Sequence, residues 1–252
     1  LKEVWLHESD GVRLSAYDFT SQEQVPLRLF VARRAGLEKS DLVVLNAIGD
    51  EGWKKFLATY RGGFADQLKK EIDSPVDEKS WEATKKMFKS FPWTMAYVSP
   101  RGVGSVAWPV DAKKRNQIAR RFLLLGQTLD GMQVFDICRA VQAVRALEAY
   151  RETPLWLQAD DKSLAGVTLY AALFEPKIAR VDLYGLPTDH RRGPYLLNVS
   201  KHLEMPQVVA MVAEKTKVIV YQADETGWDY PTKVAANLGW EKKPFSIRKP
   251  PQ

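Results

Sequence analysis

Cysteine and histidine are scarce in this 252-residue sequence. It contains one cysteine, Cys138, and three histidines, His7, His190 and His202. A single cysteine excludes a disulfide-stabilised scaffold, and fifteen glycines without a triplet repeat exclude a collagen-like fibre. No apolar run reaches the roughly 18 residues that a membrane-spanning helix needs. The sequence therefore predicts a globular chain without a transmembrane segment, in which few side chains offer thiol or imidazole chemistry.

Charges of both signs are present in similar numbers. The chain has 37 Lys and Arg against 31 Asp and Glu, a net charge of +6 at pH 7. Because the basic residues are interleaved with acidic ones along the chain, this pattern favours a solvated mixed surface over a nucleic-acid-binding patch. We expect no nucleic-acid partner.

The two ends bear on how the chain is organised. Leu1 is not an initiator methionine, and no targeting pattern follows it, while Pro250-Pro251-Gln252 is typical of a linker or tail. No internal repeat, low-complexity segment or linker interrupts the rest, and the length suits one domain. We therefore expect a single domain over residues 1–252, processed or cut from a longer chain that has further domains.

Two kinds of strand pattern occur. Ser9-Asp10-Gly11 is a tight-turn sequence between the β-prone runs Val4–Glu8 and Val12–Phe19, and Val25–Arg34 continues this antiparallel opening. Short continuous apolar runs follow, which suit strands buried on both faces of a parallel sheet. These runs are Leu42–Leu45, Thr94–Val98, Leu155–Leu157, Arg180–Leu183, Val218–Tyr221 and the closing Phe245–Arg248.

Helical patterns alternate with the apolar runs. The clearest is Asp130–Tyr150, where Cys138 falls between Ile137 and Val141 on the apolar side. The other predicted helices are Asp77–Phe88, Lys113–Leu125, Ser163–Phe174 and Tyr230–Leu238. Strands alternating with helices after an antiparallel opening predict an α/β fold with a doubly wound, mainly parallel sheet and an antiparallel N-terminal hairpin.

The loops after the apolar runs are where such a fold binds ligands, beyond the carboxyl ends of its strands. The polar residues in these loops are our pocket candidates: Asn46, Arg101, Asp160, Asp161, Lys162, Asp189 and Arg191. Neither Asp160-Asp161 nor Asp189-His190 has a recognised metal-ligand spacing. Gly102-Val103-Gly104 lacks the residues that complete a phosphate-binding loop. We expect no metal and no cofactor.

Several segments resemble one known superfamily. The turn Pro100–Ser105, with the sequence Pro-Arg-Gly-Val-Gly-Ser, is similar to the turn after the fourth strand in many α/β-hydrolases. Asp189–Pro194 and Met205–Gln207 add to the similarity, as does the order of elements from Val25 to Arg248. The chain resembles the branch that includes acetyl xylan esterases and prolyl oligopeptidases. This resemblance implies an α/β-hydrolase fold, a carbohydrate or small ester ligand, and an exported or periplasmic location.

The resemblance also implies a catalytic triad, from which the sequence departs. The nucleophile of these enzymes sits in a Gly-x-Ser-x-Gly elbow. Here Asp161 and Ala165 replace the two glycines around Ser163, and a shift of one residue places Lys162 at the nucleophile position. Asp224 matches the acid position, and no histidine follows Phe245–Arg248, which leaves His190 as the candidate base.

Three functions stay open on these residues. In the first, which we favour, the domain has a degenerate nucleophile elbow and serves as a binding or structural module. In the second, it is an active serine esterase or peptidase-type hydrolase using Ser163, His190 and Asp224. In the third, a longer chain or a partner domain supplies the missing histidine. The sequence therefore predicts a hydrolase-like fold without deciding whether the chain is an enzyme.

Overall fold

The computed structural model describes residues 1–69, 75–109, 111–240 and 244–250. Its residues fall into two compact units. The first unit comprises Leu1–Ala107 and Arg139–Leu155, and the second comprises Trp108–Cys138 and Trp156–Gln252. Helix α4 (Leu129–Ala146) runs along the chain from the second unit into the first.

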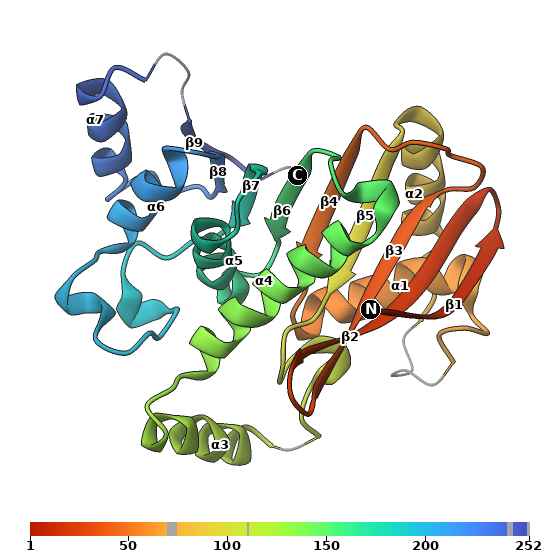
Figure 1. The fold of residues 1–252 in the computed structure, drawn as a ribbon, viewed down its shortest axis with the longest axis horizontal. Coiled ribbons are helices and arrows are strands. Elements are labelled where there is room, and N and C mark those ends of the chain that lie inside the picture. The colour runs from red at the N-terminus through yellow and green to blue at the C-terminus, as the bar shows by residue number, and fades with distance from the viewer. Residues whose placement is uncertain (70–74, 110, 241–243, 251–252) are drawn as a thin grey trace. The chain divides into compact units, whose positions relative to one another are not determined.

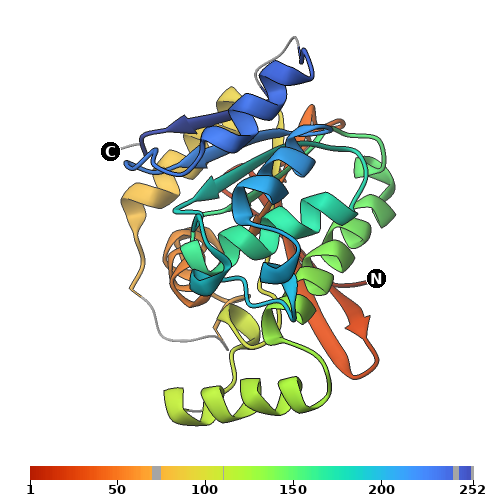
Figure 2. The ribbon, with the colours of Figure 1, turned by 90° about the vertical axis from the view of Figure 1, so that its left-hand side faces the viewer.

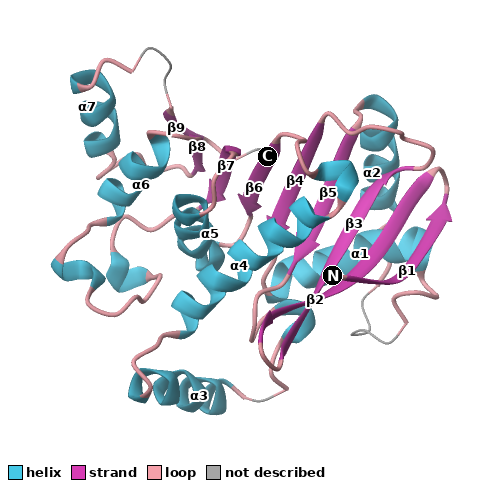
Figure 3. Ribbon diagram, in the orientation of Figure 1, coloured by secondary structure: helices cyan, strands magenta, loops and turns pink. Residues whose placement is uncertain are grey.

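The first unit is a mixed sheet with two helices on one face (Figures 1 and 3). Its strands occur in the order β1-β2-β3-β5-β4. β1, β2, β3 and β5 pair antiparallel in that order, and β5 pairs parallel with β4. The elements are β1 (Lys2–Ser9), β2 (Val12–Gln22), β3 (Val25–Arg34), β4 (Leu42–Ala47), α1 (Asp50–Phe64), α2 (Glu78–Ser90) and β5 (Trp93–Val98).

An aromatic core joins α1 and α2 to this sheet. Trp53, Phe56 and Tyr60 line one side of α1 and are 1%, 4% and 2% exposed. Phe56 contacts Phe30 of β3 at 5.0 Å between ring centroids. Trp81 of α2 completes the cluster with 1% exposure. The helices are therefore held by the burial of large rings, whose removal from water is the main stabilising term.

The second unit contains the remaining parallel strands (Figures 1 and 2). They lie in the order β6-β7-β8-β9, with β7, β8 and β9 parallel. Helix α5 connects the neighbours β6 and β7, a crossover that makes two strands parallel. The elements are α3 (Ala112–Leu124), β6 (Leu155–Ala159), α5 (Lys162–Phe174), β7 (Ile178–Tyr184), α6 (Met205–Ala213), β8 (Lys217–Tyr221), α7 (Asp229–Asn237) and β9 (Phe245–Arg248).

The predicted α/β class, the antiparallel opening and the later parallel strands are confirmed. Every predicted strand is present, and Val218–Tyr221 lies within β8 with three fully buried residues. The predicted helix Asp130–Tyr150 ends earlier, at Ala146, and a short 3₁₀ turn covers Glu148–Tyr150.

Two helices, α1 and α6, were not predicted from the sequence. Helix α1 ends with Gly62-Gly63-Phe64, and glycine has a low helix propensity. Both glycines lie against Trp81: an added Cβ at Gly62 would be 2.7 Å from its ring, and one at Gly63 would be closer still. The glycines therefore serve helix packing, which only the tertiary structure reveals.

Cys138 should resist thiol reagents in the native protein. It is 7% exposed on α4, and its Sγ lies 3.9 Å from the carbonyl oxygen of Ala171. Burial raises the pKa of the thiol to about 12, and the thiolate is the reactive form. We expect slow labelling by a chromogenic disulfide at mildly alkaline pH and rapid labelling in urea. Rapid labelling without urea would contradict the burial of this residue.

Candidate functional site

The carboxyl ends of β6, β7 and β8 meet at one edge of the second unit. Tyr184 and Tyr221 end β7 and β8, and their rings stack at 4.5 Å with 11° between planes. Gly185 donates its N–H to the carbonyl of Tyr221 at 3.0 Å. An added Cβ at Gly185 would lie 3.3 Å from the Cβ of Lys162, which follows β6. The loops that carry Ser163, His190 and Asp224 therefore all begin at this edge.

The segment around Ser163 is a capped helix start. Asp161 is the N-cap of α5, and its Oδ1 accepts a hydrogen bond from the Ser163 N–H at 2.8 Å. The Ser163 side chain is exposed. Neither Lys162 nor Ser163 is among the described non-glycine residues with positive φ. An aspartate cap also suits the positive end of the helix dipole, so the carboxylate of Asp161 has a local structural role.

His190 lies in a buried 3₁₀ turn, His190–Arg192, packed on α5. It is 3% exposed, and its Nε2 lies 2.8 Å from the hydroxyl of Tyr170. Its Nδ1 has no hydrogen-bond partner in the described part of the chain. One helical turn before Tyr170, Gly166 lies against Pro194 so closely that a Cβ there would clash. Two adjacent contacts on α5 therefore fix the loop that carries His190.

Burial lowers the pKa of His190, and the nearby carboxylates Glu204 and Asp189 offset this only in part. An unfolded histidine has a pKa near 6.5. The neutral ring therefore contributes its full stability above about pH 6.5, and this contribution is lost as the pH falls from that value toward the lower folded pKa.

Acid should consequently weaken the fold more in the wild type than in His190→Gln. We expect the urea midpoint to fall between about pH 7 and about pH 5, with a shallower fall in the variant. His202→Gln is the matched control, because the His202 side chain is exposed. An identical pH dependence in the wild type and His190→Gln would contradict the assignment.

Asp224 is exposed, and its contacts are local. Its Oδ1 accepts the N–H of Thr226 at 2.9 Å, and hydrogen bonds from Thr226 lower the pKa of its carboxyl. Its carbonyl oxygen accepts the side-chain amide of Gln222 at 2.6 Å. Among the described residues, no hydrogen bond joins Ser163, His190 and Asp224 to one another.

The other predicted pocket residues of the second unit also have local partners. Asp189 caps the short turn by accepting the Arg191 N–H at 2.8 Å. The carbonyl of Arg191 accepts the hydroxyl of Tyr195 at 3.1 Å. Asp160 is exposed, and its charge contributes to the raised pKa of Tyr184, whose main cause is burial. Asp160 is therefore close enough to Tyr184 to act on it electrostatically, and Lys162 lies against Gly185 beside the same tyrosine.

Asn46 and Arg101 belong to the first unit and are 6% and 8% exposed. The Asn46 amide donates to the carbonyls of Val44 at 3.2 Å and Ala96 at 3.0 Å. Arg101 donates to the Ser21 hydroxyl at 3.5 Å. Each of these side chains therefore fastens strands or loops within its own unit.

The turn Pro100–Ser105 that carried the resemblance has a clear structural cause. Gly104 has a φ of +57°, and an added Cβ there would clash with the side chain of Ser99. The Gly104 N–H donates to Asp50 Oδ1 at 2.8 Å, and the Ser105 N–H donates to Ser99 Oγ at 3.2 Å. Only glycine satisfies both the backbone angle and the close contact.

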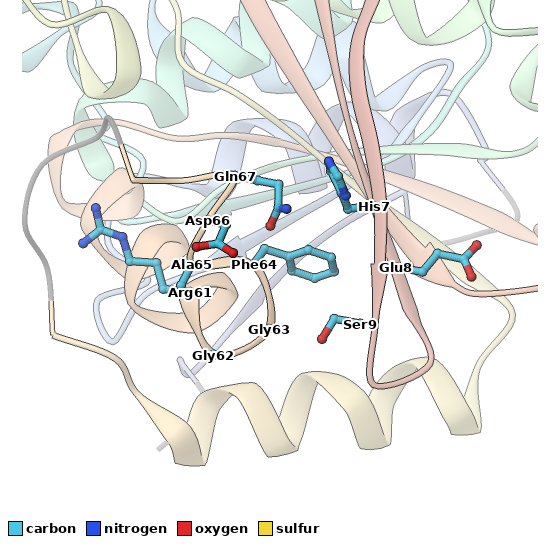
Figure 4. A pocket seen from close by; sticks show the side chains of 10 residues that line it. All are labelled: His7, Glu8, Ser9, Arg61, Gly62, Gly63, Phe64, Ala65, Asp66 and Gln67. Carbon is cyan, nitrogen blue, oxygen red and sulfur yellow. The ribbon is translucent and has the colours of Figure 1, made fainter.

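A cavity of about 310 Å³ lies in the first unit, and none of the predicted site residues lines it (Figure 4). Phe64 and Gln67 approach it from the end of α1 and the following turn, facing His7 and Ser9 of β1. His7 and Ser9 both line the cavity, and within the described residues no hydrogen bond joins them.

Among the described residues, no three His, Cys, Asp or Glu side chains are grouped in a way that could hold a metal ion. No helix in that part of the chain is both long enough and apolar enough to cross a membrane.

Sequence reasoning missed four aromatic residues of the second unit. Tyr170 holds His190, and its position seven residues after Ser163 on α5 was the available signal, because such residues share a helix face. Tyr184 and Tyr221 are each the last residue of a strand, where parallel strands bring side chains together. Trp156 of β6 lies nearby in the sheet, with the Arg180 guanidinium 4.2 Å from its ring centroid.

The fold is similar to that of solved structures, although the sequence matches no known family. No protein-family model matches the sequence, and no curated protein is significantly similar to it. Among solved structures, a Bacteroides fragilis protein assigned as an acetyl xylan esterase superposes with a TM-score of 0.68 at 15% identity, covering 98% of this chain and 68% of its own.

Two other similar structures are more distant. The acetyl xylan esterase of a Thermoanaerobacterium species has a TM-score of 0.53 at 13% identity, covering 100% of this chain and 82% of its own. Prolyl oligopeptidase B from Galerina marginata gives 0.52 at 11% identity, covering 95% of this chain and 34% of its own. The chain therefore has an α/β-hydrolase-like fold, and its structural neighbours include carbohydrate esterases, as the sequence resemblance implied.

Proposed function

We propose that this chain is a binding module with an α/β-hydrolase-like fold, which takes a carbohydrate or small ester ligand and has no working Ser-His-Asp triad. The observation that carries the proposal is the state of His190. A general base must be within hydrogen-bond reach of the hydroxyl that it deprotonates. The Nε2 of His190 is instead engaged by Tyr170, inside a loop that is 3% exposed at this residue.

The charges around Ser163 support the same proposal. Acyl transfer from a serine needs donors that stabilise a developing oxyanion. Here the carboxylates of Asp160 and Asp161 precede the turn, and Asp161 Oδ1 takes up the Ser163 N–H. Negative potential at this position opposes an oxyanion, and Lys162 neutralises it only in part. A serine in this environment has neither an activated hydroxyl nor a prepared anion site.

The ligand class follows from the aromatic groups at the same edge. Tyr184 and Tyr221 form a half-buried stacked pair at the carboxyl ends of β7 and β8. Aromatic faces suit the apolar C–H surface of sugar rings, while the neighbouring Asp160 accepts hydrogen bonds from hydroxyl groups. The similarity to acetyl xylan esterases also favours a carbohydrate-type ligand.

Ser163→Ala tests the absence of catalysis. We expect little hydrolysis of nitrophenyl acetate by the wild type and no measurable loss in the variant. The free energy of unfolding should change by less than about 0.5 kcal/mol, because the side chain is exposed and only the backbone N–H is bonded. A robust rate that disappears in Ser163→Ala would overturn the proposal.

Calorimetry with xylo-oligosaccharides tests the proposed carbohydrate binding. Tyr221→Ala should weaken binding, whereas Tyr230→Ala serves as a matched control, since Tyr230 is 45% exposed on α7. Absence of binding in the wild type, or equal binding by the two variants, would count against the proposed ligand class.

The alternative is an active esterase that uses Ser163 as nucleophile, His190 as base and Asp224 to orient it. One observation favours it: the three residues follow neighbouring strands whose carboxyl ends meet at one edge. This function requires the His190 ring to leave Tyr170, and it predicts a rate that both Ser163→Ala and His190→Gln abolish. A histidine supplied by further chain or a partner domain predicts a rate that depends on Ser163 but not on His190.

A further inference from the structure

Helix α3 (Ala112–Leu124) has no buried residue. Figures 1 and 2 show it at the bottom of each view, away from α5 and α6 of the same unit. Its contacts with the preceding segment involve Trp108: the Arg115 guanidinium donates to the Trp108 carbonyl at 3.4 Å, and the ring of Phe122 lies 6.2 Å from that of Trp108. Packing against a core therefore does not account for the apolar side chains of this helix.

Basic residues dominate the helix. Between Asp111 and Leu125 there are five basic residues and one acidic one. The acid, Asp111, is occupied as the N-cap, where its Oδ1 accepts the Lys114 N–H at 2.7 Å. The cations Lys113, Lys114, Arg120 and Arg121 have no ion-pair partner in the described parts of the chain. Positions 113 and 120, and positions 114 and 121, are seven apart, so the four cations form a stripe along the helix.

A run of exposed leucines ends the helix beside these cations. Leu123, Leu124 and Leu125 are 50%, 87% and 73% exposed. Gly126 follows with a φ of +70° and turns the chain away. The three leucines are therefore exposed at the C-terminal end of the helix. Single exposed apolar residues are common, but three in sequence beside unpaired cations are typical of an interaction surface.

We propose that α3 docks on an anionic lipid bilayer, with Leu123–Leu125 entering the boundary between headgroups and acyl chains and the basic stripe contacting lipid phosphates. A helix that combines a basic face with leucine and phenylalanine side chains has the composition of interfacial membrane helices. The occupant follows from charge complementarity and shape. A second copy of the chain would bring two basic stripes together, and a nucleic acid would leave the leucines in water.

This docking is independent of the proposed ligand site. The net charge of the whole chain is only +6, but the basic residues proposed to contact lipid are concentrated in one helix. The attraction should depend on anionic lipid and decrease with salt, because exposed charges are screened within about 8 Å at physiological ionic strength.

Vesicle co-sedimentation tests the proposal with the full chain. We expect binding to vesicles of phosphatidylcholine mixed with phosphatidylglycerol and little binding to phosphatidylcholine alone. Arg120→Gln/Arg121→Gln should weaken binding about 25-fold, since each basic residue near an anionic surface is worth about fivefold. Leu124→Gln should also weaken it, because the same charges remain while the inserted apolar surface is lost.

Matched variants elsewhere in the same unit control for charge and hydrophobicity. Lys201→Gln/Lys215→Gln removes the same charge from exposed positions, and Leu238→Gln changes a leucine that is 64% exposed. Both should bind like the wild type. The α3 variants should keep the wild-type thermal midpoint, since none of the helix's residues is buried.

Three outcomes would overturn the proposal. One is a wild type that does not bind anionic vesicles. Another is an equal effect of the α3 variants and their controls. The third is a dimer, seen by light scattering, that forms without vesicles and is lost in Leu124→Gln, which would assign this surface to self-association.

Discussion

Replacing Trp81 by alanine should lower the free energy of unfolding by about 3–5 kcal/mol. The indole is 1% exposed, and its ring meets Phe64 edge-on at 5.8 Å. The indole Nε1 donates to Asp10 Oδ2 at 3.2 Å, which joins α2 to the turn between β1 and β2. Alanine would leave a cavity against Gly62 and Gly63, whose lack of side chains leaves nothing to fill it.

Urea unfolding of Trp81→Ala and Phe91→Ala checks this expectation. Phe91 follows the same helix but is 45% exposed, so its truncation should cost much less. A second readout is the titration of Asp10, because the bond from Trp81 is the main cause of its lowered pKa and Lys85 is the next. A change of less than about 1 kcal/mol in Trp81→Ala would show that the core around α2 adapts to the loss.

Arg180→Met should also destabilise the protein strongly, by about 3 kcal/mol or more. Asp182 is 5% exposed in the centre of β7, and its Oδ1 pairs with Arg180 Nε at 2.9 Å. Burial raises the pKa of this carboxyl, and Arg180 opposes the rise. Removing the guanidinium leaves a buried carboxylate without its charge partner, and it also removes the cation over Trp156 and the bond to the Tyr221 hydroxyl at 3.1 Å.

A double-mutant design separates the pair from the packing. Arg180→Met/Asp182→Leu should recover much of the loss, because replacing both members of a buried pair by apolar groups costs less than breaking it. Lys233→Met is the control, since Lys233 and Asp229 form an exposed pair at 3.8 Å with side chains 75% and 84% exposed. A double variant as unstable as Arg180→Met would contradict the role of the unpaired carboxylate. The loss in Arg180→Met should shrink in acid, where the carboxyl of Asp182 is neutral.

The sequence pattern predicts the elements that carry Trp81 and the Arg180–Asp182 pair, but it does not predict the contacts that these residues make. Trp81 lies in a predicted helix, but its burial depends on α1, which was not predicted because Gly62-Gly63 disfavours a helix locally. Arg180 and Asp182 lie in a predicted strand, and the strand pattern does not indicate that the two side chains form a buried ion pair. The burial of Trp81 depends on the packing of two helices. The Arg180–Asp182 pair depends on the two-residue period of a strand, which places both side chains on one face.

The strands and most helices could be predicted because their signals are local. Apolar runs such as Leu42–Leu45 and Val218–Tyr221 are short and unbroken, which suits strands covered on both faces. The apolar spacing of α4 likewise places Cys138 on its buried side. The turn at Asp10-Gly11 has positive φ at both residues, as its sequence indicates.

The site was predictable only as a set of loops. The sequence alone determined that Ser163, His190 and Asp224 follow strands of an α/β fold, because strand order and the carboxyl-edge rule depend on local patterns. Only the tertiary structure decided the hydrogen-bond partner of His190, which is the Tyr170 hydroxyl. Asp161 and Asp224 instead accept the backbone N–H two residues further along the chain, and such contacts are local. The physical reason is that a hydrogen bond depends on positions within a few tenths of an ångström. The packing of α5 against the loop at His190 and Pro194 sets those positions, and no periodicity in the sequence encodes it.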